Sequence, residues 1–161
     1  MDKCVETPLF IISFINPSMF LGEYKHNVDM KGRMAIPAKF RMKLDGGAIL
    51  TRGLDKCLFL FPQGEWSNLV GKLMNLPLAQ ASSRAFVRLM LSGASDVDFD
   101  AQGRVLIPES LRKYAGIEKK TIVTGLYNRI EIWDEDEWDK YKSRTESASD
   151  EIAEKLGELG I

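Results

Sequence analysis

The sequence contains few of the side chains from which metal centres and most catalytic sites are built. It has one histidine, His26, and two cysteines, Cys4 and Cys57. Two isolated cysteines form no disulfide framework, which favours a reducing compartment, and with one histidine they supply no ligand set for zinc. We find no Cys-His or Ser-His arrangement that would activate a nucleophile. The sequence therefore predicts no metal, no cofactor and no catalytic residue.

Long hydrophobic runs are also missing. The apolar stretch Leu9–Ile15 is shorter than the roughly 20 residues that span a bilayer. It is a poor signal peptide, because acidic residues flank Lys3 and no small-residue cleavage site follows. We interpret residues 1–18 as an atypical extension from an upstream start, with Met19 as the natural start; the alternative is an apolar arm that packs on a neighbour. We expect a cytoplasmic protein without membrane contact.

The net charge of −1 hides an uneven distribution. Residues 1–130 hold 18 basic and 12 acidic side chains, whereas residues 131–161 hold 4 and 11. A basic body with an acidic tail can favour a polyanion while the whole chain is nearly neutral. The alternative is a solvated acidic helix on an ordinary domain. The length of 161 residues suits one domain, or two small halves that share a core.

One segment of the sequence occurs twice. Asp29–Pro37 (DMKGRMAIP) returns as Asp100–Pro108 (DAQGRVLIP) at an offset of 71. At an offset of 72, Gly53-Leu54 returns as Gly125-Leu126, and Glu65-Trp66 returns as Glu137-Trp138. These matches indicate a duplicated unit of about 70 residues. Two equivalent surfaces suit a binding protein better than an enzyme with one pocket.

Each copy predicts the same order of elements: strand, turn, short strand, short helix, two strands and a closing helix. The expected strands are 20–28, 33–36, 48–51 and 58–61, then 95–99, 104–107, 121–124 and 129–133. The expected helices are 37–44, 63–76, the connector 79–91, 108–115, and 135 to about 155. We expect Gly53 and Gly125 in turns and Trp66 and Trp138 as core anchors. Beyond about Ser143 we expect a frayed or disordered end.

The repeated segment has the composition of a tight turn. Asp29 and Asp100 can accept local backbone hydrogen bonds, and Gly32 and Gly103 tolerate a positive φ. The series Asp96, Asp98, Asp100 resembles the start of a calcium loop. Its sixth position is Ala101 instead of glycine, and its twelfth is not the glutamate that a calcium loop requires. We therefore exclude calcium.

Turn chemistry alone does not require the arginines that follow, Arg33 and Arg104. In one interpretation each arginine pairs with the aspartate of its own turn. In the other, both arginines aim at one side, where guanidinium groups can contact phosphates or read guanine. Lys31 adds charge to the first turn, and Gln102 adds hydrogen-bonding capacity at the equivalent place in the second. We predict Arg33, Arg104, Lys31 and Gln102 as DNA-binding residues.

These segments together resemble the MraZ family. The resemblance covers Met19-Phe20-Leu21-Gly22-Glu23-Tyr24, both copies of the repeated segment, and Ser92-Gly93-Ala94, and it extends to roughly Tyr141. It implies an α+β fold, namely a duplicated AbrB-like swapped-hairpin β-barrel with short helices, in which two repeats form one pseudo-dimeric domain. We expect the first repeat at 19–76, the connector at 77–91, the second repeat at 92–143 and an acidic tail at 144–161.

The resemblance also implies a function. MraZ proteins bind short promoter repeats in double-stranded DNA as ring-like homo-oligomers, and they usually repress the division and cell-wall gene cluster, including their own promoter. Their DNA-contacting arginine corresponds to Arg33, and its duplicate to Arg104. We therefore expect a nucleoid-associated transcriptional regulator. The alternative is an oligomeric scaffold that binds protein partners of cell division.

Overall fold

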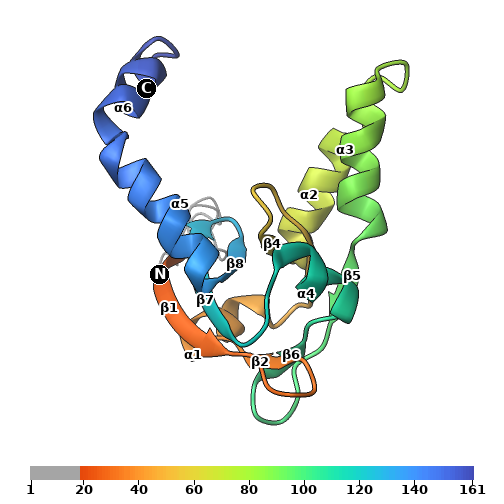
Figure 1. The fold of residues 1–161 in the computed structure, drawn as a ribbon. Helices are drawn as coiled ribbons and strands as arrows, with labels where there is room; N and C mark the ends of the chain where they lie inside the picture. The colour runs from red at the N-terminus through yellow and green to blue at the C-terminus, as the bar shows by residue number, and fades with distance from the viewer. Residues whose placement is uncertain (1–18) are drawn as a thin grey trace, which may run out of the picture.

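The computed structural model describes residues 19–161, so our interpretation of residues 1–18 lies outside the described part. The strands are β1 (Phe20–Asn27), β2 (Arg33–Ala35), β3 (Ala48–Arg52), β4 (Leu58–Pro62), β5 (Ser95–Val97), β6 (Arg104–Leu106), β7 (Lys120–Tyr127) and β8 (Ile130–Asp134). The helices are α1 (Ala38–Arg41), the 3₁₀ turn η2 (Met42–Leu44), α2 (Gln63–Met74), α3 (Ala81–Ser92), α4 (Glu109–Ala115), α5 (Glu135–Ser147) and α6 (Ser149–Gly157). Figure 1 shows their arrangement.

The two repeats exchange their first strands. Six strands form a sheet in the order β1-β7-β8-β4-β3-β5, which is symmetric under exchange of the repeats. β1 pairs with β7 of the second repeat along all eight residues, from Phe20 opposite Tyr127 to Asn27 opposite Lys120. In return, β5 of the second repeat pairs with β3 of the first. The α+β fold with a duplicated, strand-exchanged unit is therefore confirmed.

Strand pairing does not run continuously around a barrel. β2 and β6 leave the large sheet and pair with one another in a separate two-stranded ribbon. Each of these strands is three residues long and is followed within two residues by a proline, Pro37 or Pro108. Proline lacks a backbone N–H and cannot extend the ladder. The ribbon is therefore short, and it projects at the end of the molecule opposite the long helices (Figure 1).

Both repeats contribute to one hydrophobic core. Phe20 of β1 contacts the edge of the Phe40 ring of α1, with 5.4 Å between the ring centroids. Met34 of β2 and Val105 of β6, directly opposite one another, are buried in the same cluster. Leu111 of α4 is also buried in this cluster. Since neither repeat can bury its apolar surface without the other, the chain is one domain.

A second cluster lies on the other face of the sheet. Phe59 and Phe61 of β4 and Trp133 of β8 are buried there. The two tryptophans of the repeated Glu-Trp pairs pack at its edge and stay partly exposed. Trp66 lies 5.9 Å from Phe61, and Trp138 lies 5.3 Å from Trp133, measured between ring centroids. They anchor helices α2 and α5 to the sheet, outside the shared core.

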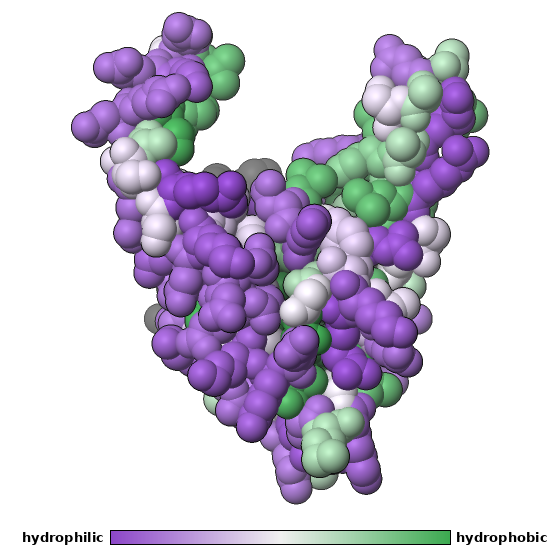
Figure 2. All heavy atoms as spheres, in the orientation of Figure 1, coloured by the Kyte–Doolittle hydropathy of each residue, from purple (hydrophilic) through white to green (hydrophobic). Residues whose placement is uncertain are grey.

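Two helical arms extend from this second cluster. The first arm consists of α2 and α3, and the second arm of α5 and α6 (Figure 1). Hydrophobic surface gathers on the sides of the arms that face each other (Figure 2). Among residues 19–161, no helix combines the length and apolarity that crossing a membrane requires.

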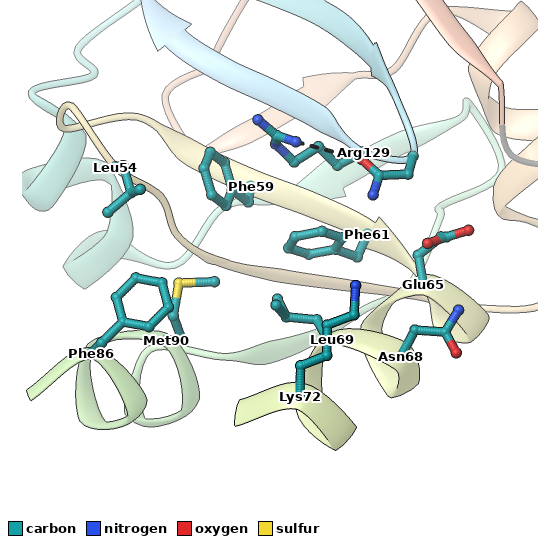
Figure 3. Close-up of a pocket in the computed structure, with 11 residues that line it drawn as sticks. Leu54, Phe59, Phe61, Glu65, Asn68, Leu69, Lys72, Phe86, Met90 and Arg129 are labelled. Atoms are coloured by element: carbon teal, nitrogen blue, oxygen red, sulfur yellow. Dashed lines mark hydrogen bonds between the residues drawn. The ribbon is translucent and has the colours of Figure 1, made fainter. Parts of the chain in front are cut away.

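A pocket of about 270 Å³ lies beside the first arm (Figure 3). Phe59 and Phe61 of β4 form one wall, while Leu69 of α2 and Phe86 and Met90 of α3 form the other. Polar side chains, including Lys72 and Arg129, surround its mouth. The connector helix α3 therefore packs on the first repeat through Phe86 and Met90.

The expected frayed end after Ser143 is wrong, because α5 continues to Ser147 and α6 follows from Ser149 to Gly157. The helix expected from 135 to about 155 is present, but it is divided at Ala148. The Asp134 carboxylate caps α5 by accepting hydrogen bonds from the backbone N–H groups of Asp136 and Glu137. In α6, Lys155 and Glu151 form an ion pair at 2.9 Å, one turn apart. Caps and pairs of this kind stabilise helices whose sequences are largely polar.

Gly125 also differs from expectation, since it lies inside β7 rather than in a turn. A Cβ atom there would lie 2.5 Å from the backbone nitrogen of Leu21 and 2.6 Å from the carbonyl carbon of Phe20. The absence of a side chain lets β1 approach β7. Gly53 does lie in the turn between β3 and β4, as predicted.

We predict that Gly125→Ala lowers the free energy of unfolding by about 1–3 kcal/mol, because the added methyl group overpacks the β1–β7 contact. Gly71→Ala is the matched control, because Gly71 lies in α2 with open space around it. Alanine at this helical position should raise the free energy of unfolding by about 0.5–1 kcal/mol. Urea denaturation at one protein concentration measures both. Equal midpoints for Gly125→Ala and the parent chain would contradict the close approach.

Candidate nucleic-acid interface

The turn between β1 and β2 is organised by one carboxylate. Asp29 Oδ1 accepts hydrogen bonds from the backbone N–H groups of Lys31 and Arg33, both at 2.9 Å. Its Oδ2 accepts from Arg33 Nε at 2.8 Å. The backbone closes the same loop, since Gly32 N–H donates to the Asp29 carbonyl at 3.0 Å. A single side chain thus fixes both the loop and the direction of its arginine.

The turn between β5 and β6 repeats this geometry almost atom for atom. Asp100 Oδ1 accepts from the backbone N–H groups of Gln102 at 2.9 Å and Arg104 at 3.0 Å. Its Oδ2 accepts from Arg104 Nε at 2.8 Å. Gly103 N–H again donates to the aspartate carbonyl at 3.0 Å. We call the segments Asp29–Arg33 and Asp100–Arg104 the two Asp-Arg turns.

Both turns require glycine at their fourth position. Gly32 has φ +82° and Gly103 has φ +72°, in the left-handed region where other residues are strained. Each glycine also lies under an arginine of the opposite repeat. Arg112 covers Gly32, with its guanidinium 3.0 Å from where a Cβ would be, and Arg41 covers Gly103 so closely that a Cβ would overlap it.

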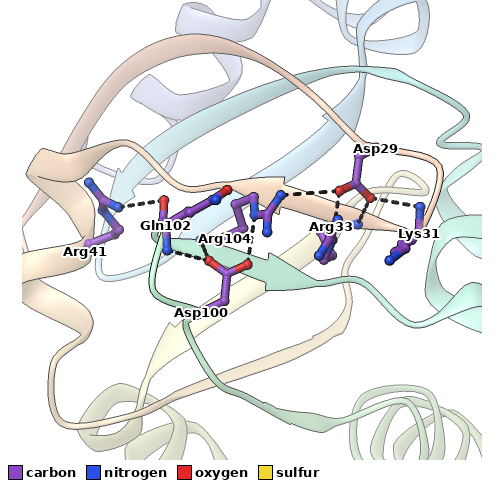
Figure 4. Close-up of polar contacts among 7 residues, drawn as sticks. All are labelled: Asp29, Lys31, Arg33, Arg41, Asp100, Gln102 and Arg104. Atoms are coloured by element: carbon purple, nitrogen blue, oxygen red, sulfur yellow. Dashed lines mark hydrogen bonds and ion pairs between the residues drawn. The ribbon is translucent and has the colours of Figure 1, made fainter.

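The β2–β6 ribbon brings the two turns together on one face. Arg33 pairs with Leu106, and Arg104 pairs with Ala35, across the ribbon. Arg104 Nη1 lies 3.7 Å from Oδ2 of Asp29, so one carboxylate lies near the arginines of both repeats. Figure 4 shows the resulting row of polar side chains, from Arg41 and Gln102 at one end to Lys31 at the other. The structure thus brings together all four predicted DNA-binding residues.

The aspartates are negatively charged at neutral pH. Hydrogen bonds from the backbone N–H of Arg33 hold the pKa of Asp29 below its ordinary value, and Arg104 does the same for Asp100. The intramolecular ion pair of our first interpretation is therefore present. It leaves each arginine side chain partly accessible, because Arg33 and Arg104 expose 33% and 26% of their side-chain surface. The ion pair within each turn therefore does not bury its arginine.

Sequence reasoning missed Arg41 and Arg112. Arg41 follows Phe40 at the end of α1, and Arg112 lies in α4; they are separated by the same offset of 71 as the turns. Arg41 Nη1 donates to the Gln102 carbonyl at 3.4 Å, and Arg112 Nε donates to the Ile107 carbonyl at 3.1 Å. The repeat offset was the signal that could have revealed this second pair.

The described residues offer little chemistry beyond charge. No group of three or more histidine, cysteine, aspartate or glutamate side chains in residues 19–161 is arranged to hold a metal ion. Cys57 is buried, and burial raises the pKa of its thiol far above the ordinary range. A thiol of this kind is a poor nucleophile. The arrangement on the β2–β6 face suits binding of an anionic surface.

Comparison with known proteins identifies the duplicated unit. The family described as "MraZ protein, putative antitoxin-like" matches residues 19–89 and again residues 90–158. The transcriptional regulator MraZ of Alkaliphilus oremlandii is 52% identical over 143 residues, covering 89% of this chain and 100% of the relative. The proteins of the same name from Halothermothrix orenii and Desulforamulus reducens are 50% and 47% identical, covering 89% and 88% of this chain and 100% and 99% of their own lengths. This chain belongs to the MraZ family.

Proposed function

We propose that this chain is a sequence-specific DNA-binding transcriptional regulator and not an enzyme. In this proposal a ring-like homo-oligomer binds short repeated elements in double-stranded DNA, represses the division and cell-wall gene cluster that includes its own promoter, and acts in the cytoplasm on the nucleoid. The two equivalent Asp-Arg turns on one face carry the proposal. The name of the relatives, transcriptional regulator, supports it.

Each arginine is held in advance for contact with DNA. Asp29 engages Nε of Arg33 and Asp100 engages Nε of Arg104. In this proposal the Nη groups contact phosphate oxygens or O6 and N7 of guanine, and Arg104 Nη1, which lies 3.7 Å from Asp29 Oδ2, exchanges that long contact for DNA. A side chain that is already ordered loses less entropy on binding. In this proposal Arg33 and Arg104 read bases, while Lys31, Gln102 and the neighbouring Arg41 and Arg112 contact the backbone.

One chain supplies only a few such contacts, which are too few for firm binding at physiological salt. Several chains in one assembly overcome this limit, because docking of one face raises the effective concentration of the next face at the adjacent DNA repeat. The spacing of the repeats is then read by the geometry of the assembly. Occupation of the promoter obstructs transcription without any covalent step.

We predict that Arg33→Ala abolishes the protected footprint on DNA immediately upstream of the protein's own gene. Removal of one bidentate guanine interaction costs about 1–3 kcal/mol per chain, and these costs combine across an assembly. Arg104→Ala should weaken binding in the same direction, but less, because Gln102 replaces a lysine beside it. Lys140→Ala is the control: this exposed lysine pairs with Glu137 in α5, and its removal should leave the footprint intact.

The same footprinting experiment separates a regulator from the scaffold alternative. Circular dichroism and light scattering on each variant establish that fold and assembly, respectively, are preserved before DNA is added. If Arg33→Ala binds the promoter with the affinity of the parent chain, the Asp-Arg turns are not the reading surface. If the parent chain gives no salt-dependent footprint at all, the scaffold interpretation replaces this proposal.

The one charge difference between the turns gives a second prediction. Lys31→Gln should make the slope of log K against log salt concentration shallower, by about one unit for each phosphate that a bound chain no longer neutralises. Gln102→Lys, the reciprocal change, should steepen that slope by a similar amount. Fluorescence anisotropy with a promoter duplex over a salt series measures both. Slopes that do not move in opposite directions would show that these positions do not touch phosphate.

A further inference from the structure

The outward face of the β2–β6 ribbon carries apolar side chains as well as arginines. Side chains alternate along a strand, and the middle residue of each of these strands is buried in the shared core. The four residues on the outward face are Arg33, Ala35, Arg104 and Leu106. Leu106 lies directly opposite Arg33, and Ala35 lies opposite Arg104. Directly opposite residues share one side of a ribbon, with about 4.5–5.5 Å between their Cβ atoms, so each arginine has an apolar neighbour.

The two halves of this face differ in the size of that neighbour. Leu106 is 57% exposed, although both of its neighbours in the chain are buried. Ala35 occupies the equivalent place at the repeat offset of 71 and has only a methyl group. Met30, in the turn that carries Arg33, is fully exposed, and its equivalent in the second turn is Ala101. The large exposed apolar side chains of the ribbon and its turns therefore flank Arg33.

The position of Leu106 carries more information than its exposure. Single exposed leucines are common on protein surfaces and do not by themselves indicate a partner. Leu106, however, belongs to a ribbon that the shared core holds in place, and the Arg33 side chain opposite it is fixed by Asp29. When Arg33 contacts a base, Leu106 is therefore presented to the same groove at a defined place.

DNA offers one apolar group to such a side chain. The major groove admits a two-stranded ribbon, and the apolar group that base edges present there is the C5-methyl group of thymine. This methyl group protrudes from the base edge, so a side chain shorter than arginine can touch it. Successive bases of one strand are about 3.4 Å apart along the helix axis. A side chain opposite Arg33 thus meets the base pair next to the one that Arg33 contacts.

We propose that Leu106 is a specificity residue that contacts the C5-methyl group of a thymine beside the guanine bound by Arg33. Ala35 is too short to make the equivalent contact beside Arg104, so the preference for thymine belongs to the Arg33 half of the face. This inference rests on the proposed function, and it adds an apolar contact to the polar ones described above.

Uracil in place of thymine tests the contact, because the two bases differ only by that methyl group. The parent chain should bind a promoter duplex about three- to fourfold more weakly when the contacted methyl group is removed. Fluorescence anisotropy with duplexes that each carry one uracil locates the sensitive position. Leu106→Ala should bind the thymine duplex as weakly as the parent binds the uracil duplex, and it should not respond to the exchange. Leu106→Asn, which keeps the size of the side chain, should behave in the same way.

Two further variants are matched controls. Leu159→Ala removes an exposed leucine beyond the end of α6, at the opposite end of the molecule from the ribbon (Figure 1), and should keep the preference for thymine. Ala35→Leu places a leucine opposite Arg104 and should create a second position that is sensitive to uracil. Circular dichroism and light scattering establish that each variant keeps the fold and the assembly of the parent chain.

The outcomes separate this inference from the proposed function. If Leu106→Ala keeps the full preference for thymine, another side chain contacts the methyl group and the inference is wrong. It is also wrong if the parent chain binds thymine and uracil duplexes equally while its footprint still depends on Arg33, and the proposed function then stands. A parent chain that leaves no footprint would contradict the proposed function and, with it, this inference.

Discussion

Eight consecutive residues of β1 pair with a strand that lies about a hundred positions later in the chain. This exchange determines the rest of the molecule. Because β1 is held against β7 of the second repeat, the turn that follows it emerges beside the turn of that repeat, and β2 meets β6. The ribbon between them has only three residue pairs, yet the shared core beneath it, including Met34 and Val105, fixes its position.

In each Asp-Arg turn, the aspartate orders the arginine side chain while that side chain stays accessible to solvent. A guanidinium aimed at a polyanion must be exposed, but an exposed arginine side chain is flexible and loses much entropy when it is ordered. Asp29 and Asp100 limit that freedom through one hydrogen bond to Nε each, while two backbone N–H groups per carboxylate hold the aspartate itself. The cost is partial neutralisation of the arginine charge. Arg41 and Arg112 add positive charge beside the turns without a carboxylate partner among residues 19–161.

The sequence predicted what is local or repeated. The offset of 71 located both turns, and Asp and Gly chemistry predicted their closure, because those interactions span only five residues. It could not predict that Gly125 meets β1 or that Arg41 covers Gly103, since both contacts join segments that only the exchanged topology brings together. The segment beyond Ser143 was expected to fray because its composition is polar, whereas Ile152 and Leu156 lie one turn apart in α6.

Strand exchange between halves of one chain has an evolutionary consequence. A dimer of identical subunits must present two identical turns, so every substitution appears twice and the face keeps perfect twofold symmetry. In this chain the two halves are encoded separately, and each can change alone. Lys31 and Gln102 occupy equivalent places in turns that otherwise superpose bond for bond. The fused face therefore has a direction, with one end that differs chemically from the other, which no symmetric pair of subunits could acquire by point mutation.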